Sequence, residues 1–163
     1  MNGVLLAVDP GITTGYALVE INSRRVIEAG TLSRREPWFR ERMMSLMRRA
    51  SHAVIEGQFI RLGRRANHKT VRSVIEAKGE LETLWGLVHG PENRPLVLQP
   101  QQWQRPLGIR GSDTKSPSMK VASMSTGREI TNHNLADAVN LGLHAVGEVI
   151  KQEALLNAVS KGA

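Results

Sequence analysis

The chain lacks cysteine entirely and contains no long apolar run. Without cysteine, its 163 residues cannot form a disulfide, a thiolate zinc site or a cysteine nucleophile, so any metal must be held by oxygen or imidazole ligands. No apolar stretch approaches the ~20 residues that cross a bilayer, and the first residues lack the basic segment that begins a signal peptide. Internal repeats, linkers and low-complexity tracts are also absent. These absences predict a soluble, cytoplasmic protein with one domain over residues 1–163.

Acidic residues are also fewer than basic ones. Asp and Glu number 15 against 22 Lys and Arg, which gives a formal net charge of +7 and a pI near 10.5. This balance favours a polyanionic partner, nucleic acid first, because Lys and Arg neutralise phosphates and release their counterions. Arginine outnumbers lysine 16 to 6, and its planar guanidinium suits phosphate well. A codon-usage bias or a heat-adapted source is an alternative explanation for part of that ratio.

Hydrophobic periodicity predicts an α/β fold. Strands are expected at residues 3–9, 13–21, 25–32, 53–59 and 94–100, and helices at 37–50, 67–89 and 132–151. The order β-β-β-α-β-α-β-α implies a mixed sheet, antiparallel in its first three strands, with helices packed on its faces. Residues 108–125 have the least regular pattern and are expected to be an irregular, mobile segment.

Three acidic residues interrupt apolar segments. Asp9 and Glu56 end the first and fourth predicted strands, and Asp137 lies within the last predicted helix, where aspartate competes for backbone hydrogen bonds. Taken singly, they are also explained as a turn residue, an exposed strand end and an arginine partner. Together they can converge, and buried carboxylates that repel one another require a cation. Mg²⁺ or Mn²⁺ would meet that need, so a basic protein with this cluster is predicted to be a metal-dependent nuclease.

Four blocks of sequence resemble a known family: VDPGITTGYALVE (8–20), AVIEGQF (53–59), SVIEAKGELETLW (73–85) and HNLADAVNLGLHA (133–145). They resemble the RuvC-type Holliday junction resolvases of the ribonuclease H-like superfamily, and most of all its compact bacteriophage members, whose site of action is the bacterial host cytoplasm. The resemblance spans nearly the whole chain, and DPG followed by TGYALV is its most specific part. It implies a ribonuclease H-like fold with helices on both faces of a five-stranded sheet. It also implies paired, symmetric, metal-dependent cleavage of four-way DNA junctions that leaves 5′-phosphate and 3′-hydroxyl ends.

The resemblance further implies a metal site for two Mg²⁺ or Mn²⁺ ions. Asp9, Glu56 and Asp137 match the family's metal-binding carboxylates. Three residues before the last of them the family has Asp or His, whereas this chain has Asn134. An amide oxygen still ligates a hard ion but adds no charge, so the second ion is expected to bind more weakly. Asn134 is tolerated naturally, or His133 takes its place, or the change was introduced to disable the enzyme, and the sequence leaves these alternatives open.

Other residues match positions that face DNA in the family. Lys115 resembles a catalytic lysine near the scissile phosphate, and Phe59 an aromatic that stacks on a base at the junction centre. A solvated lysine and a core phenylalanine are the alternatives. The basic residues between Glu56 and the long helix are predicted to contact phosphates, with a solvated surface as the alternative: Arg61, Arg64, Arg65, His68, Lys69 and Arg72.

The predicted helix at 67–89 has more apolar residues than one sheet face requires, and Gly79 would permit close approach by another helix. In the family this element forms a homodimer interface, and a twofold dimer suits a nearly twofold junction. An ordinary core helix is the alternative. Trp103 is expected to anchor a short helix to the core.

Three rival functions fit parts of the sequence. An actin-like ATPase or sugar kinase also has an aspartate and glycine after its first strand, but it requires a second phosphate loop and a far longer chain. A catalytically impaired junction-binding protein is compatible with Asn134. A broader nuclease that cuts flaps and forks is compatible with the phage resemblance, and substrate comparison with and without metal separates it from a strict resolvase.

Overall fold

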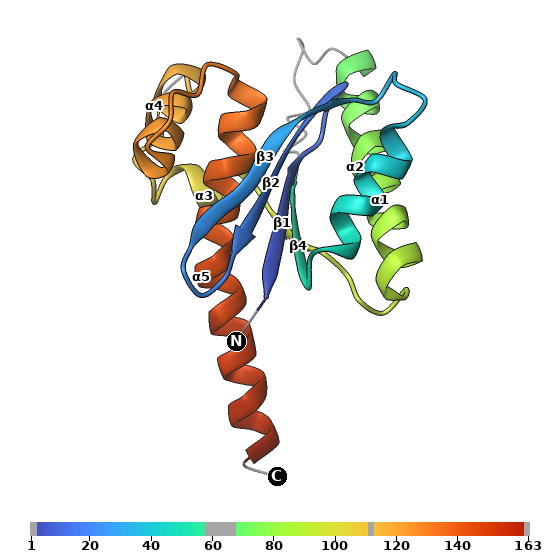
Figure 1. The fold of residues 1–163 in the computed structure, drawn as a ribbon, viewed down its shortest axis with the longest axis vertical. Coiled ribbons are helices and arrows are strands. Elements are labelled where there is room, and N and C mark those ends of the chain that lie inside the picture. The colour runs from blue at the N-terminus through green and yellow to red at the C-terminus, as the bar shows by residue number, and fades with distance from the viewer. Residues whose placement is uncertain (1–2, 58–67, 111–112, 162–163) are drawn as a thin grey trace.

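The computed structural model describes residues 3–57, 68–110 and 113–161, and it shows one sheet between two layers of helices (Figure 1). The strands are β1 (Val4–Asp9), β2 (Thr13–Glu20), β3 (Arg25–Ser33), β4 (His52–Glu56) and β5 (Leu96–Leu98). The helices are α1 (Phe39–Arg48), α2 (His68–His89), α3 (Pro100–Gln104), α4 (Lys115–Thr126) and α5 (His133–Lys161).

The sheet has the predicted mixed topology. Its strand order is β3-β2-β1-β4-β5. The first three strands pair antiparallel, whereas β4 pairs parallel with both β1 and β5. The parallel pairs require crossover connections, and α1 and α2 provide them. As a result, β1 lies at the centre, and its carboxyl end adjoins that of β4.

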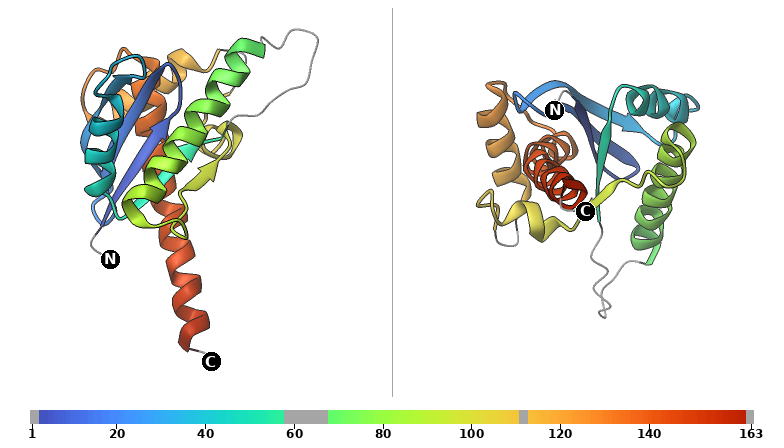
Figure 2. Two further views of the ribbon diagram at one scale, coloured as in Figure 1. Left: turned by 90° about the vertical axis from the view of Figure 1, so that its right-hand side faces the viewer. Right: turned by 90° about the horizontal axis from the view of Figure 1, so that it is seen from below.

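Each face of the sheet has its own core, because side chains along a strand alternate between faces. Leu5 and Ala7 of β1 pack toward α3, α4 and α5, whereas Leu6 and Val8 pack toward α1 and α2. The end-on view in Figure 2 shows these two helical layers on opposite sides of the sheet. The predicted helices on both faces are therefore confirmed.

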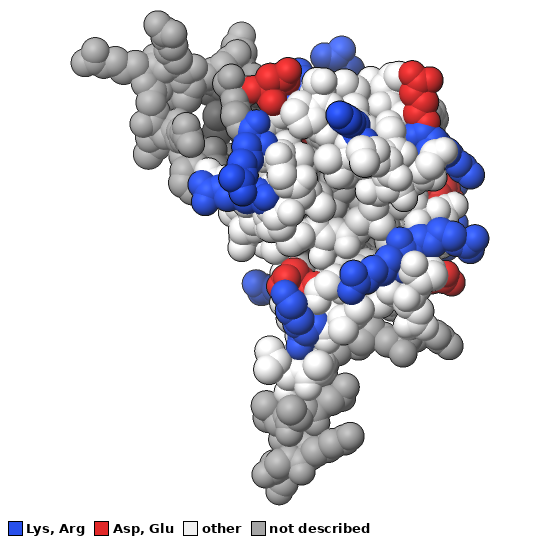
Figure 3. Space-filling model, turned by 90° about the vertical axis from the view of Figure 1, so that its left-hand side faces the viewer, with Lys and Arg blue, Asp and Glu red and all other residues white. Residues whose placement is uncertain are grey.

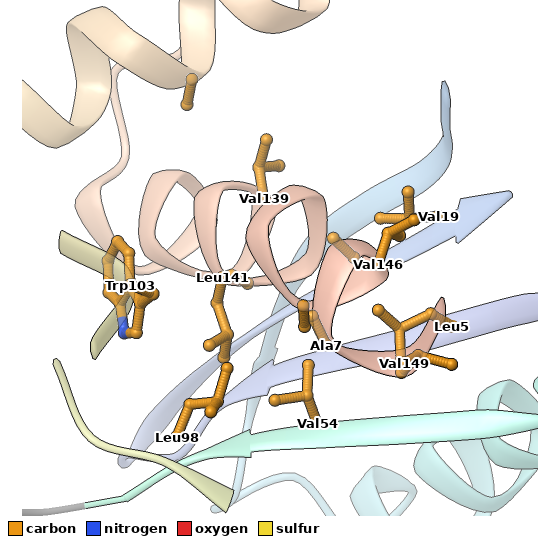
Figure 4. Packing of buried hydrophobic residues seen from close by; sticks show 14 of the residues in the cluster. Leu5, Ala7, Val19, Val54, Leu98, Trp103, Val139, Leu141, Val146 and Val149 are labelled. Carbon is orange, nitrogen blue, oxygen red and sulfur yellow. The ribbon is translucent and has the colours of Figure 1, made fainter. Parts of the chain in front are cut away.

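Helix α5 packs closely over the centre of the sheet. Figure 4 shows Leu141, Val146 and Val149 of α5 lying against side chains from the strands, whereas Val139 points away from the sheet. Gly142 makes this approach possible, since a Cβ there would lie 2.9 Å from Val19 Cγ2 and 3.0 Å from Ala7 Cβ. The remainder of α5 extends past the sheet (Figure 1).

The expectation of an irregular segment at residues 108–125 is wrong, because α4 spans Lys115–Thr126. Its sequence, KSPSMKVASMST, has few apolar residues, so the helical period is weak. Pro117 is tolerated because it lies in the first turn, where no intrahelical donor is lost. Ser118 and Ala122 are buried, so packing against α5 stabilises this helix.

Other boundaries differ by smaller amounts. β5 covers only Leu96–Leu98 of the predicted 94–100, and Pro100 begins α3. α5 continues to Lys161 rather than ending at 151, because Ala, Leu, Glu and Lys are good helix formers. Trp103 is fully buried in α3, which confirms it as the anchor of a short helix.

Within the described ranges, no helix combines the length and apolarity needed to cross a membrane.

Candidate active site

Asp9 and Glu56 lie at the carboxyl ends of β1 and β4, on the face of the sheet that α5 covers. In the parallel pairing of β1 and β4, Val8 stands opposite Ile55, so the next residues, Asp9 and Glu56, end neighbouring strands. Such strands lie about 4.8 Å apart. Ala7 and Val54 both belong to the core beneath α5. Because side chains alternate, the two carboxylates point toward the same face as these residues.

The turn behind Asp9 is fixed by hydrogen bonds. The Thr14 hydroxyl donates to the Gly11 carbonyl at 3.0 Å, and the backbone N–H of Arg34 donates to the Ile12 carbonyl at 2.8 Å. Beyond Glu56, the Gly57 N–H donates to the Leu98 carbonyl at 2.8 Å, which ties the end of β4 to β5. Both acidic strand ends are thus held by the backbone of the sheet.

Gly15 brings the first turn of α5 to these carboxylates. Gly15 pairs directly with Asp9 across the β1–β2 ladder. A Cβ on Gly15 would lie 2.0 Å from the Asn134 carbonyl oxygen and 3.3 Å from Ala138 Cβ. Only glycine therefore allows α5 to approach β2 at this point, which places Asn134 and Asp137 over the end of β1.

Asp137 receives a hydrogen bond from a residue that the sequence did not single out. The Ser118 hydroxyl of α4 donates to Asp137 Oδ1. Asn140, one turn after Asp137, donates from Nδ2 to both the carbonyl and the hydroxyl oxygen of Ser118, each at 2.9 Å. The sequence of residues 108–125 does not indicate a helix, so it gives no reason to expect Ser118 beside Asp137.

All three carboxyl groups have a raised pKa, and for two of them the charge of another carboxylate contributes. Burial first, and the charge of Asp137 second, raise the pKa of Asp9 from 3.8 to about 8. Burial also raises the pKa of Glu56 well above its ordinary value, and the charges of Asp9 and Asp137 add to that effect. Burial raises the pKa of Asp137, opposed by the Ser118 hydrogen bond and the positive charges of His133 and Lys115. Because Asp137 acts on both Asp9 and Glu56 through its charge, the three groups lie within electrostatic range of one another.

The donor set suits a hard divalent cation. Carboxylate and amide oxygens are the ligands that Mg²⁺ and Mn²⁺ accept. A cation among these groups would offset the cost of ionising buried carboxylates and would reduce the repulsion between their charges. Among the residues that the structure describes, however, no three His, Asp or Glu side chains already form a group that could hold a metal. An ion at this site would therefore draw the carboxylates together rather than enter a finished cage.

Two other predicted residues lie near Asp137. Lys115, the first residue of α4, and His133, the first residue of α5, both act on its pKa through their charge. Asn134 follows His133 and is half-buried. The predicted arrangement of Lys115, Asn134 and Asp137 thus falls at the adjoining starts of two helices.

Most of the predicted DNA contacts cannot be placed. Arg72 is exposed on α2, and its Nε donates to Glu76 Oε1 at 2.7 Å. The remainder lie outside the residues or side chains that the structure describes: Phe59, Arg61, Arg64, Arg65, His68 and Lys69. On the face formed by α3, α4 and α5, Lys and Arg side chains occur in several separate groups (Figure 3).

Comparison with known proteins identifies the fold. No protein-family model and no curated protein sequence matches the chain. Among solved structures, RuvC of T. thermophilus in complex with a Holliday junction substrate superposes with a TM-score of 0.64 at 19% identity, covering 87% of this chain and 92% of that one. A second Thermus thermophilus RuvC structure gives 0.60 at 18% identity, covering 91% and 96%. The chain has the α/β, ribonuclease H-like fold of RuvC, as the sequence predicted.

Proposed function

We propose that the protein is a structure-selective endodeoxyribonuclease that resolves four-way DNA junctions by paired, symmetric cuts. The observation that carries this proposal is the placement of Asp9, Glu56 and Asp137 within electrostatic range of one another, in a fold shared with a protein solved in complex with a Holliday junction substrate. The net charge of +7 supports a DNA substrate. Residues 1–163 act as one nuclease domain in this proposal.

In this proposal Asp9, Glu56 and Asp137 hold Mg²⁺ or Mn²⁺, and the Asn134 amide oxygen completes the ligands of the second of two ions. Such ions clamp the attacking and leaving oxygens of a phosphodiester. The sheet and α5 hold the backbone of these residues in place, so only their side chains would have to move together when the ions bind. Water attacks phosphorus and the bond to the 3′ oxygen breaks, which leaves a 5′-phosphate and a 3′-hydroxyl.

Lys115 has a separate role in the proposal. Its position at the start of α4, within electrostatic range of Asp137, suits an ammonium that stabilises the charge developing on the scissile phosphate. Phe59 stacks on a base at the crossover. The basic residues Arg61, Arg64, Arg65, Lys69 and Arg72 contact the phosphates that lead to the site.

A homodimer through α2 would give the two active sites that paired cuts require. The buried face of α2 carries Leu81, Leu84 and Trp85, while Ile75 and Leu87 are 50% and 71% exposed on the outer face. A pocket of about 610 Å³ lies along this outer face, lined in part by Gly79, Gly86 and Leu87. A Cβ on Gly79 would meet no atom within 4 Å, which leaves room for a partner helix.

A second candidate is an impaired enzyme that binds junctions without cutting them efficiently. Asn134 in place of the Asp or His of the family favours it, as does the lack of a ready three-residue metal group among the described residues. A nuclease that also cuts flaps and forks is the third possibility that the test must address.

Incubation of the purified protein with labelled four-way junction, flap, fork and plain duplex, with and without Mg²⁺ or Mn²⁺, tests the proposal. We expect symmetric, ligatable nicks in the junction that require metal and are lost in Asp9→Asn. Equal cutting of flaps and forks would indicate the broader nuclease. Tight junction binding with no cutting at any metal concentration would identify the impaired binder and refute the resolvase.

A further inference from the structure

Ser118 is a polar residue buried completely between α4 and α5. Its hydroxyl is directed at Asp137, to which it donates a hydrogen bond. Other hydroxyls of α4 are used differently: Ser123 donates to the Met119 carbonyl and Thr126 to the Ala122 carbonyl, both at 2.8 Å. Those bonds stay within the helix, as is usual for Ser and Thr. The Ser118 hydroxyl instead links α4 to a carboxylate of the candidate site.

Asn140 determines the direction of that hydrogen bond. Its Nδ2 donates to the Ser118 carbonyl oxygen, which can only accept, so the amide cannot be rotated the other way without loss. The same nitrogen also donates to Ser118 Oγ. Because that oxygen already accepts from Asn140, its single proton is free to be donated to Asp137. The chain of donors therefore runs from Asn140 to Ser118 to Asp137.

Packing alone does not account for this arrangement. The contact between α4 and α5 already contains the buried Ala122, with Met119 and Val121 beside it. A buried hydroxyl adds nothing to such an apolar contact unless it is hydrogen-bonded. The Asn140 Oδ1 atom is itself buried with no hydrogen-bond partner among the described residues. Burying this oxygen without a partner costs free energy, and the two hydrogen bonds from Nδ2 to Ser118 offset that cost.

We propose that Ser118, oriented by Asn140, is a positioning residue that holds the Asp137 carboxylate in one orientation for a divalent cation. The hydroxyl occupies Oδ1 and leaves Oδ2 available as a ligand. Hydrogen bonds to metal ligands commonly affect metal affinity by about 10- to 100-fold. The inference rests on the proposed metal-dependent function, and it assigns to α4 a part in metal binding besides the role of Lys115.

Ser118→Ala and Ser123→Ala form a matched pair, because both remove one hydroxyl from the same helix. We expect Ser118→Ala to weaken Mn²⁺ binding to the DNA-free protein by about tenfold, measured from the paramagnetic resonance signal of free Mn²⁺. Junction cleavage should fall in parallel at low Mn²⁺ and approach the wild-type rate at saturating Mn²⁺. Ser123→Ala, whose hydroxyl also accepts from the Ile130 N–H, is expected to lower the melting temperature but leave Mn²⁺ affinity unchanged.

Asn140→Leu provides a second variant of similar volume that keeps the hydroxyl but removes the group that orients it. We expect a smaller loss of Mn²⁺ affinity in the same direction, with melting in EDTA showing that the protein is folded. Unchanged Mn²⁺ affinity in folded Ser118→Ala would overturn the proposal and leave a purely structural hydroxyl. Wild-type protein that binds no Mn²⁺ and cuts no junction would instead refute the proposed function itself.

Discussion

At the scale of single residues, the raised pKa of Asp9 makes the stability of the fold depend on pH. The folded, metal-free protein holds the Asp9 proton up to about pH 8, whereas the group's ordinary pKa is 3.8. The folded state therefore binds more protons than the unfolded chain across this interval. Stability is fully present below the lower value and falls as the pH rises toward the upper one. A bound divalent cation would remove this loss, since it favours the ionised carboxylate.

Asp9→Asn is accordingly expected to stabilise the metal-free protein while it abolishes metal-dependent cleavage. The free energy of unfolding in EDTA should rise by on the order of 1–3 kcal/mol at about pH 8, and by little at about pH 3, where aspartate is largely protonated in both states. Urea denaturation at both pH values measures the change. Glu129→Gln, on the exposed loop before α5, controls for the altered net charge. A loss of stability at the higher pH would contradict a buried, repelled carboxyl at this position.

The second residue-scale prediction concerns Asn134. A carboxylate at this position would add charge to the ligands of the second ion, so Asn134→Asp should increase Mg²⁺-dependent junction cleavage at least several-fold. The same charge would join three groups that already repel one another, so the melting temperature in EDTA should fall. Cleavage rates over a series of Mg²⁺ concentrations measure the first effect.

Asn132→Asp is a close control for that substitution. The Asn132 side chain accepts a hydrogen bond from the Leu135 N–H at 3.1 Å, and aspartate serves equally well at such a helix start. It therefore adds the same charge two residues earlier without disturbing α5. If Asn134→Asp and Asn132→Asp give identical rates across the Mg²⁺ series, Asn134 does not belong to the site.

At the scale of secondary-structure elements, the site depends on how closely α5 approaches the sheet. A Cβ on Gly15 would lie 2.0 Å from a backbone oxygen of α5, and backbone cannot rotate away as a side chain can. Gly15→Ala should therefore displace the first turn of α5, destabilise the protein by on the order of 1–3 kcal/mol, and reduce cleavage severely. Junction binding should persist, because the basic residues are unchanged. Urea denaturation and cleavage assays measure the two losses.

Gly147→Ala is the contrasting change within α5. A Cβ there would meet no atom within 4 Å, so the helix should gain about 0.5–1 kcal/mol from the loss of a glycine. Cleavage should be unaffected. A Gly15→Ala variant as active as Gly147→Ala would show that the position of the α5 start does not control the chemistry.

The elements also show which parts of the fold the sequence could predict. The central strands are continuous apolar runs because both of their faces are buried, and α2 has an apolar stripe because one of its faces is buried. The order of these elements predicts the mixed sheet. α4 has no such stripe, since only Ser118 and Ala122 are buried in it. Its helical state depends on packing against α5, the next helix along the chain, and the local sequence pattern does not show such tertiary contacts.

The residues of the candidate site also differ in how well the sequence predicts them. Asp9 and Glu56 are predictable because charged residues that end buried strands break a visible pattern, and parallel strands bring such ends together. Ser118 breaks no pattern, since serine is unremarkable in a polar segment. Its importance arises from two tertiary hydrogen bonds, with Asp137 and Asn140. The side chains that support a site are for this reason harder to predict than the charged groups that form it.

At the scale of the whole molecule, paired cuts require two sites in a fixed relation. The outer face of α2 is a surface suited to join two copies, because the exposed Leu87 and Ile75 each line a pocket that Gly79 also lines. In a symmetric interface every contact occurs twice, because the same surface of both copies is used. A charge introduced there is therefore introduced twice, and each copy must be desolvated without a partner.

Leu87→Glu is expected to convert a dimer to a monomer while each chain remains folded, since Leu87 lies outside the core. The molar mass from light scattering should halve. Cleavage of a cruciform plasmid should change from paired incisions, which give a linear product, to uncoupled single nicks, which give a nicked circle. Leu155→Glu is the matched control, because Leu155 is 68% exposed, close to the 71% of Leu87, but lies in the C-terminal part of α5. A wild-type protein that is monomeric on the junction, or a Leu87→Glu variant that still cuts both strands together, would exclude α2 as the interface. Equal dissociation by both variants would indicate that α5 takes part in the assembly as well.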